Sequence, residues 1–345
     1  MIQPTCPMPA LHYDKVVMGH GSGGQMTDEL IRTIFAPAFE MPKQLGDAAV
    51  LSKWGGGDLV FSTDSFVVQP LFFPGGNIGS LAVSGTVNDL AMMGATPIYL
   101  SAGFILEEGL ELEVLKHIVK TMADTAKEAG VCIVTGDTKV VERGHGDGVY
   151  INTAGVGIRN GISRPHSGRA KVGDVLLVNG TLGDHGMAIM GVRHHLNLGG
   201  GLCSDAAPLN GLVNALLDVC PNVHVLRDLT RGGLAAAVNE IAHESGVTIE
   251  IEEEHVPVRE SVRGACEILG FDVFQVANEG KLLAIVDAAD AEAVLGAMHA
   301  HPLGKEAACI GLVTDVSDGR VVCKTAFGSM RVMDMPVGEL LPRIC

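Results

Sequence analysis

The sequence predicts an α/β (α+β) protein of two domains, each with a mixed sheet. The chain has 345 residues, which is enough for about two domains. Segments with strand periodicity alternate with segments of helical periodicity through both halves, as in layered α/β proteins. A polar stretch with one proline and two glycines, residues 164–174, interrupts this pattern. We therefore predict an N-terminal domain over 1–163, a C-terminal domain over 164–330 and a tail over 331–345.

In the first half, the clearest helix is expected over 111–129. Leu115, Ile118 and Met122 lie on one face there, and Gly130 is a typical residue for the end of a helix. The helix expected at 77–93 consists mostly of small residues, which indicates close packing against a sheet. The remaining expected elements are a helix at 25–39, strands at 59–69, 98–106, 131–135 and 148–158, and a turn at 70–76.

The second half repeats this organisation. Strands are expected at 175–179, 247–251, 282–286 and 308–313, and helices at 184–194, 209–219, 232–245, 259–269 and 289–301. Residues 331–345 contain two prolines and show little periodicity. We expect this tail to lie on the surface or to move.

Composition and charge exclude several classes of function. Lys plus Arg number 24 and Asp plus Glu number 40, so the net charge of −16 disfavours nucleic acids and anionic membrane surfaces. The long uncharged run at 65–88 is broken by prolines and glycines, and no signal peptide is recognised at the N-terminus. The eight cysteines include no C-x-x-C pair and no zinc-finger spacing. These features predict a cytoplasmic protein without a disulfide framework.

A glycine-rich segment, Gly-His-Gly-Ser-Gly-Gly at 19–24, precedes the first expected helix. It satisfies G-x-G-x-x-G, but residues 41–46 are not strand-like, so a dinucleotide fold is not supported. A Walker-type loop is absent. Backbone N–H groups at a helix N-terminus bind anions, which makes Gly21, Ser22, Gly23 and Gly24 candidates for holding phosphate. A flexible turn is the alternative.

Five aspartates lie in apolar or glycine-rich settings: Asp47, Asp64, Asp89, Asp137 and Asp228. Asp64 is in the middle of an apolar strand, where a carboxylate is costly unless it binds a cation or hydrogen-bond donors. Several such acids on separate elements suit Mg²⁺ together with substrate phosphates. The alternative is that each acid caps a helix or turn, and Asp228 in particular is a candidate N-cap.

Several motifs of the chain together are highly specific. They are the glycine-rich segment at 19–24, Ser-Thr-Asp-Ser at 62–65, Pro-Leu-Phe-Phe-Pro-Gly-Gly-Asn-Ile-Gly at 70–79, Asn-Asp-Leu-Ala at 88–91, Thr-Gly-Asp-Thr-Lys-Val-Val at 135–141, Arg-Asp-Leu-Thr-Arg-Gly-Gly at 227–233, Asn-Glu-Gly-Lys at 278–281 and the terminal Pro-Arg-Ile-Cys at 342–345. With them the chain resembles, along essentially its whole length, the HypE family of hydrogenase maturation factors. That family belongs to a superfamily with aminoimidazole ribonucleotide synthetase, thiamine-monophosphate kinase and selenophosphate synthetase. Residues 1–15 look like an extension particular to this chain.

The resemblance implies a homodimer in which the strands of two N-terminal domains close a shared β-barrel. It implies ATP and Mg²⁺ in a cleft of that dimer, with Asp64, Asp89, Asp137 and Asp228 at the metal. From the same resemblance, Asp47, Asn88, Thr138 and Gly232 are expected to join the glycine-rich segment at the nucleotide.

The resemblance also implies a role for the terminal cysteine. The carbamoyltransferase HypF would load a carbamoyl group onto the sulfur of Cys345. The protein would then use ATP to dehydrate this group to a thiocyanate, and the cyanide would pass to iron on the HypC–HypD complex, for the nickel–iron hydrogenase site. Residues 336–345 can extend about 33 Å at ~3.3 Å per residue, enough to visit another enzyme and return. We expect Arg343 to favour the thiolate and the chain-end carboxylate to oppose it.

The chemistry gives two further candidates. Phosphorylating the amide oxygen makes it a good leaving group, and this requires a cation near the oxygen and a base near the nitrogen. Lys139 is a candidate cation and Glu279 a candidate base, while Lys281 is expected to hold phosphate or to balance charge. A structural ion pair is the alternative for each.

Two other functions are compatible with parts of the sequence. One is an ATP-dependent kinase or synthetase for a free small molecule, which would not need a thiol at its end. The other is an assembly adaptor without catalytic activity, which would not need a nucleotide site.

Overall fold

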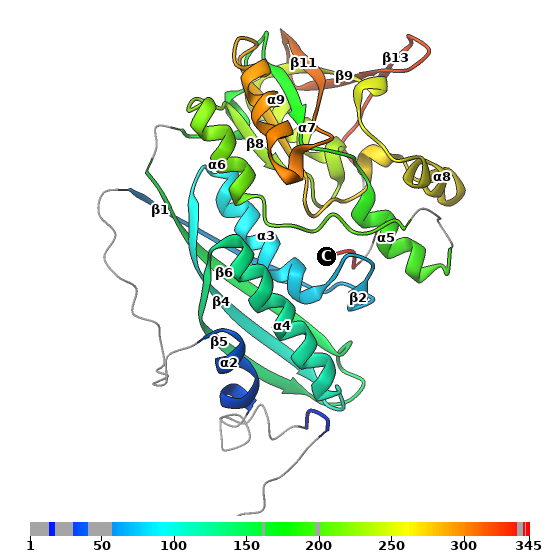
Figure 1. Cartoon of the computed structure of the whole chain (residues 1–345). Coiled ribbons are helices and arrows are strands. Elements are labelled where there is room, and N and C mark those ends of the chain that lie inside the picture. The colour runs from blue at the N-terminus through cyan, green and yellow to red at the C-terminus, as the bar shows by residue number, and fades with distance from the viewer. Residues whose placement is uncertain are drawn as a thin grey trace, which may run out of the picture.

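The structure, a computed structural model, describes residues 14–17, 30–40, 57–160, 163–196, 201–336, 341 and 343–345. It contains two main sheets with helices packed on them (Figure 1). Near the N-terminus, a short π-helical turn (Ile31–Phe35) leads into α2 (Ala36–Ala38). The predicted α/β class with two mixed sheets is confirmed.

The first sheet has four strands in the order β1 (Asp58–Phe66), β6 (Val149–Arg159), β4 (Thr96–Glu107) and β5 (Cys132–Val141). Only β4 and β5 run parallel, so the sheet is mixed. Helices α3 (Ile78–Met92) and α4 (Leu112–Ala129) cover one face (Figure 1). The other face is open in this chain and exposes Leu59, Phe61 and Ile105.

Helix α3 is the central element of this half. Every residue of it except Asp89 is buried, which explains its small, apolar composition. Asn77 and Ser80 form a reciprocal capping box at its start. A Cβ atom on Gly85 would lie 2.8 Å from the Phe66 ring, so the glycine lets the helix approach β1 closely. The short hairpin of β2 (Phe72–Phe73) and β3 (Gly76–Asn77) replaces the simple turn expected before α3.

The second sheet has seven strands. Their order is β13 (Met330–Val332), β12 (Arg320–Lys324), β9 (Val247–Glu252), β11 (Ala308–Val316), β7 (Val175–Val178), β10 (Leu282–Val286) and β8 (Val225–Asp228). Helix α7 (Gly233–Ser245) packs on one face, and α6 (Asn210–Val219) and α9 (Ala291–Ala300) pack on the other. Helices α5 (Asp184–Arg193) and α8 (Glu260–Leu269) contribute instead to the core of the first half.

Three local predictions were wrong. Strand β5 continues to Val141, so Asp137 lies inside a strand and does not follow one. Asp228 ends β8, an edge strand that was not predicted, and the N-cap of α7 is Gly232. Strands β12 and β13 were also missed, so the first residues of the expected tail belong to the sheet.

Within the described ranges, no helix has the length and apolar character needed to cross a membrane.

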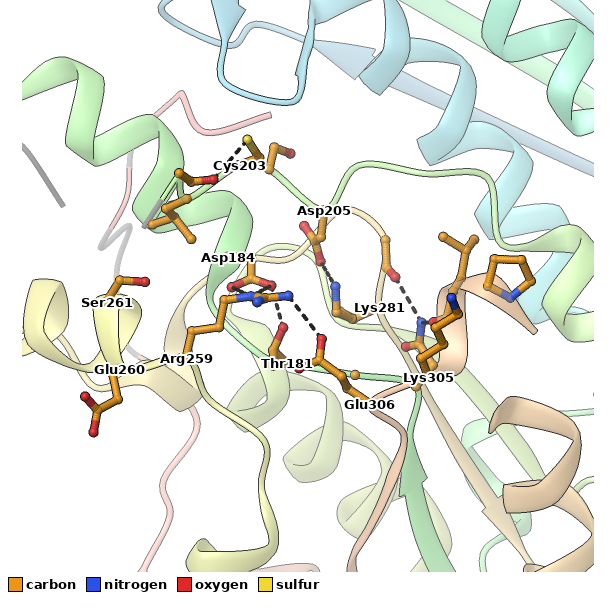
Figure 2. A pocket seen from close by; sticks show the side chains of 18 residues that line it. Thr181, Asp184, Cys203, Asp205, Arg259, Glu260, Ser261, Lys281, Lys305 and Glu306 are labelled. Carbon is orange, nitrogen blue, oxygen red and sulfur yellow. Dashed lines mark hydrogen bonds and ion pairs between the residues drawn. The ribbon is translucent and has the colours of Figure 1, made fainter. Parts of the chain in front are cut away.

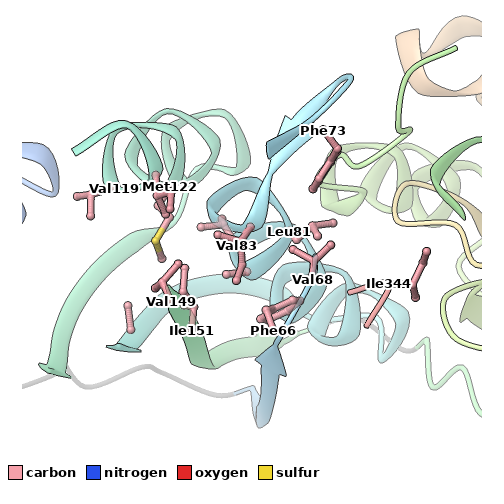
Figure 3. Close-up of a cluster of buried hydrophobic side chains, with 14 of the residues drawn as sticks. Phe66, Val68, Phe73, Leu81, Val83, Val119, Met122, Val149, Ile151 and Ile344 are labelled. Atoms are coloured by element: carbon pink, nitrogen blue, oxygen red, sulfur yellow. The ribbon is translucent and has the colours of Figure 1, made fainter. Parts of the chain in front are cut away.

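The end of the chain lies between the two halves, near β2 and α5 (Figure 1). The Val67 N–H donates to a carboxylate oxygen at the chain end of Cys345 at 3.1 Å, and the Gln69 N–H donates to the Arg343 carbonyl oxygen at 3.2 Å. Ile344 is only 2% exposed and joins the core cluster that contains Phe66, Val68 and Leu81 (Figure 3). The described end is therefore docked and not on the surface, because its apolar side chains fill the core. Movement of the tail stays a prediction.

Candidate functional site

Three of the predicted acids come together where β1, α3 and β8 meet. Asp64 faces α3, with one carboxylate oxygen 3.7 Å from the position of a Cβ on Gly85. Asp89 accepts a hydrogen bond of 2.7 Å from the Ser62 hydroxyl. Burial raises the pKa of all three carboxyls, and that of Asp228 rises to about 6, with the charge of Asp89 as the next cause. The cluster thus concentrates negative charge in a partly dry place.

Glu279 lies beside this cluster, on the segment that leads into β10. It is 3% exposed, and its Oε1 atom has no hydrogen-bond partner. Burial raises its pKa well above the usual range, and the charges of Asp205, Asp228, Asp64 and Asp89 add to the rise. In this chain alone the surroundings therefore favour the neutral, protonated form of the carboxyl.

Cys345 reaches the same place from the end of the chain. Its thiol interacts with the Arg231 guanidinium and the Glu279 carboxyl, and burial is the main reason that its pKa rises to about 12. The docked thiol is therefore neutral. The expectation that Arg343 favours the Cys345 thiolate is wrong for the docked tail. Its guanidinium instead pairs with Asp147 at 2.8 Å and donates to the Val67 carbonyl oxygen.

Asp137 and Lys139 do not join the cluster of their own chain. They pair with each other at 2.8 Å and are 69% and 63% exposed. Asp137 pairs across the sheet with Gly103, and Gly103 pairs with Asn152. The side chains at these positions lie on the open face of the sheet. Asp64 lies on the helix-covered face, where its partner Thr153 donates to the Ala82 carbonyl oxygen of α3. The prediction that all four metal-site acids meet is therefore not met within one chain.

The residues that were expected to bind the nucleotide lie in different parts of the structure. Both ends of the Asn88 amide bind backbone groups: Oδ1 accepts from Leu209 N–H, and Nδ2 donates to the carbonyl oxygens of Ala207 and Glu279. The Thr138 side chain is buried on the helix-covered face of the sheet, whereas Asp137 and Lys139 lie on the open face. Gly232 begins α7 with φ of 82°. Gly21, Ser22, Gly23, Gly24 and Asp47 lie outside the described residues.

A cavity of about 800 Å³ is lined by Gly280 and Lys281, just before β10, and by Asp205 and Arg259 (Figure 2). Lys281 and Asp205 form an ion pair of 2.8 Å there, with side chains 10% and 5% exposed. Arg259 links Asp184 and Glu306 at the rim. Because Lys281 is held by Asp205, it balances charge, and the alternative that it holds phosphate is not supported.

The acid cluster suits a hard cation in charge and in donor type. Within the described ranges, no three His, Cys, Asp or Glu side chains are close enough together to hold a metal ion. Asp64, Asp89 and Asp228 nevertheless combine raised pKa values with neighbouring negative charge, which a divalent cation would relieve.

Both halves of the chain match known protein families. The N-terminal and C-terminal domain models of the AIR synthase related proteins match residues 45–159 and 171–324. "Carbamoyl dehydratase HypE" of Cupriavidus necator is 53% identical over 336 residues, covering 96% of this chain and 95% of that one. The Escherichia coli protein of the same name is 49% identical, covering 96% and 100%.

The chain belongs to the HypE family.

Solved structures of HypE proteins have the same fold. One, of HypE in complex with ATP, has a TM-score of 0.91 at 48% identity and covers 95% of this chain and 99% of its own. Another, of a HypE–HypF complex, has a TM-score of 0.79 at 48% identity, covering 91% and 100%. A thiamine-monophosphate kinase from Stenotrophomonas maltophilia has a TM-score of 0.64 at 20% identity, covering 85% and 92%, which shows the fold alone.

Four residues around the docked tail of this HypE chain were not predicted. Arg231 interacts with the Cys345 thiol, and its positive charge partly offsets the rise that burial causes in the pKa of Asp64. Asp205 accepts a hydrogen bond from the backbone N–H of Glu279 at 3.0 Å. His185 and Arg193 bind carbonyl oxygens of the tail. The motif at 227–233 contains Arg231 and could have indicated it, but the other three gave no local signal.

Proposed function

We propose that this protein is an ATP-dependent carbamoyl dehydratase that acts on its own C-terminal cysteine. The observation that carries the proposal is the docking of Cys345 beside Arg231 and Glu279, next to the acid cluster. A largely buried thiol among these charged groups suits a residue that carries the reacting group. The names of its relatives, carbamoyl dehydratase, support the same reaction.

The reaction begins with the S-carbamoyl group, –S–C(=O)–NH₂, on Cys345. The amide oxygen attacks the γ-phosphorus of ATP and the nitrogen loses one proton, which gives –S–C(–O–PO₃)=NH and ADP. The C–O bond then breaks, phosphate leaves, and the second N–H proton is lost. The product is –S–C≡N, and the net change on the tail is the loss of one water.

The chain's own groups fit these steps. Glu279 lies where it can take a proton from the nitrogen, because its carboxyl is next to Cys345. Arg231 lies at the sulfur and can stabilise negative charge that develops there. Asp64, Asp89 and Asp228 would contribute one or two carboxylates to each Mg²⁺, with the ATP phosphates as the other ligands, and the metal would neutralise the charge of those phosphates when bound. Filling that site would remove charges that now raise the pKa of Glu279 and so favour its basic form.

We infer that the functional unit is a homodimer with a shared cleft. The two free edges of the four-stranded sheet are β1 and β5, and its open face exposes Leu59, Phe61 and Ile105. Closing two such sheets into a barrel would set β5 of one subunit beside β1 of the other and would cover this apolar face. The partner's β5, which carries Asp137 and Lys139, would then lie beside β1, which carries Asp64, and Lys139 could act as the cation at the reacting oxygen.

Two partners are proposed for the tail. HypF would load the carbamoyl group, and the solved complex of a related HypE with HypF supports this contact. The HypC–HypD complex would accept the cyanide for the iron of nickel–iron hydrogenases. We place these steps in the cytoplasm, where ATP is supplied. In this proposal, the domain at 1–163 binds the nucleotide and the domain at 164–330 supports the site. The tail at 331–345 carries the reacting group between the partners and the site.

The experiment is mass spectrometry of the C-terminal peptide after incubation with HypF and its substrates, and then with Mg–ATP. The expected result is a carbamoyl mass on Cys345 that later decreases by one water. Cys345→Ala is expected to fold and to bind ATP but to gain no carbamoyl mass. A carbamoyl group found on the Cys345→Ala chain would contradict the assignment.

The second candidate is a kinase or synthetase for a free small molecule. Its only support is the fold of thiamine-monophosphate kinase. The docked tail occupies the space beside Glu279 that a free substrate would need, so we favour the first function.

A further inference from the structure

His185, in the first turn of α5, is completely buried and uses both ring nitrogens. Its Nε2 lies 2.8 Å from the carbonyl oxygen of Ile344, and its Nδ1 lies 2.8 Å from the hydroxyl of Ser204. A carbonyl oxygen can only accept, so Nε2 carries the hydrogen and Nδ1 accepts from Ser204. The Ser204 oxygen in turn accepts from the Ala206 N–H at 3.1 Å. These bonds fix one neutral tautomer.

The imidazole completes the recognition of the tail backbone. The Arg343 carbonyl oxygen accepts from the Gln69 N–H, and a chain-end carboxylate oxygen of Cys345 accepts from the Val67 N–H. The Ile344 carbonyl between them accepts from His185. Two elements distant in sequence therefore hold the last residues, one through backbone pairing and one through a side chain.

The residues that support His185 also support the catalytic base. Ser204 is followed by Asp205, which accepts from the Glu279 N–H at 3.0 Å. The N–H of Ser204 donates to the Pro74 carbonyl oxygen at 2.7 Å, which anchors this loop to the first half of the chain. The Phe73 ring and the imidazole are nearly perpendicular, with ring centroids 5.5 Å apart. A shift of this loop would move the tail and the base together.

We propose that His185 and Ser204 form a latch that holds the tail in the cleft with Cys345 directed toward Glu279 and Arg231. The inference rests on the proposed function, since holding the tail serves catalysis only if Cys345 carries the substrate. His185 is a positioning residue because it touches the tail backbone and not the reacting group. The His185 bond is one neutral hydrogen bond among several contacts of the docked tail, which include the backbone bonds of Val67 and Gln69 and the Arg193 contact. Its loss should therefore weaken docking without abolishing it.

The test measures docking in the full-length chain without ATP or HypF. Iodoacetamide alkylates Cys345 faster when the tail is undocked, and mass spectrometry of the C-terminal peptide follows the rate. His185→Leu removes the donor and is expected to raise the rate roughly three- to tenfold, the change that one neutral hydrogen bond makes in an equilibrium constant. His185→Gln can still place an N–H near the Ile344 carbonyl and should raise the rate less. Cys309, which is exposed on β11 and outside this loop, is the internal control and should react at an unchanged rate.

An unchanged Cys345 rate in His185→Leu would overturn the latch. So would equal increases at Cys345 and Cys309, since these would indicate general loosening. If His185→Leu does not fold, Ser204→Ala decides: it removes the group that fixes the tautomer and should raise the Cys345 rate at least twofold, whereas no change would refute the proposal. Carbamoylated His185→Leu should also lose water more slowly at saturating ATP, with ATP affinity unchanged. If even the wild-type chain loses no water, the proposed function fails, while the alkylation result still judges the latch.

Discussion

Asp205 holds Glu279 and Lys281 at the same time. One of its carboxylate oxygens accepts the Glu279 N–H at 3.0 Å, and the other pairs with the Lys281 ammonium at 2.8 Å. The Lys281 and Asp205 side chains are almost completely buried, so each charge is stabilised mainly by the other. The arrangement fixes the backbone of the base and keeps Lys281 away from the acid cluster.

The first prediction concerns the stability of this pair. Asp205→Asn leaves the Lys281 ammonium buried without a counter-charge, and we expect a loss of about 3–5 kcal/mol in the free energy of unfolding. Asp205→Asn combined with Lys281→Met removes both charges and should recover much of that loss. Urea unfolding of the three proteins measures this. Equal stability of the single and double variants would show that the pair is not coupled.

The second prediction concerns the base. Glu279→Gln keeps the shape of the side chain but cannot take a proton, so dehydration should slow by about 10²–10⁴-fold. Carbamoyl loading and ATP binding should stay normal. The measurement is the loss of water from the carbamoylated C-terminal peptide over time at saturating ATP. A near-normal yield of thiocyanate would mean that another group takes the proton.

The third prediction concerns pH and Asp228. A carboxyl pKa raised from 3.8 to about 6 means that the folded state binds a proton that the unfolded state has released between these values. Stability without metal should therefore fall as pH rises through this window, by up to about 3 kcal/mol. Asp228→Asn cannot ionise and should be more stable than wild type at pH 7.5 without Mg²⁺, with the difference disappearing below pH 4.

Thermal unfolding with and without Mg²⁺ measures this effect. Mg²⁺ should stabilise the wild type and should stabilise Asp228→Asn much less. An Asp228→Asn chain that is less stable than wild type at pH 7.5 without metal would contradict the assignment of the raised pKa.

The fourth prediction concerns the shared cleft. Asp64→Asn and Lys139→Ala homodimers should each dehydrate poorly. A heterodimer of one Asp64→Asn chain and one Lys139→Ala chain would contain one complete cleft, built from Asp64 of the second chain and Lys139 of the first. The rate should then return to about half that of wild type.

Isotope labelling of one chain identifies which tail reacts. Only the tail of the Lys139→Ala chain should lose water, because its own Asp64 and Glu279 are intact. An inactive heterodimer, or sedimentation as an active monomer of 36.0 kDa, would contradict a cleft shared between subunits.

Local patterns predicted the elements that bury one face. Helix α4 begins and ends within a residue of its expected limits, since its apolar stripe and terminal Gly130 are both local signals. Strand β8 was missed because it has only four residues and is defined by pairing with β10. The continuation of β5 to Val141 was missed because its glycine and charged residues do not suggest a strand, and pairing with β4 maintains it.

By itself, the sequence determined the family, the two-sheet α/β class, the acids in apolar settings and the terminal cysteine. These follow from composition, short-range periodicity and motifs, each of which lies within a few consecutive residues. Only the tertiary structure decided that Asp64, Asp89, Asp228 and Glu279 gather around Cys345 while Asp137 and Lys139 face the other side of the sheet. Only the fold brought His185, Asp205 and Arg193 to the tail. The reason is that strand register and packing set which face a side chain occupies, and both depend on contacts between residues far apart in the chain.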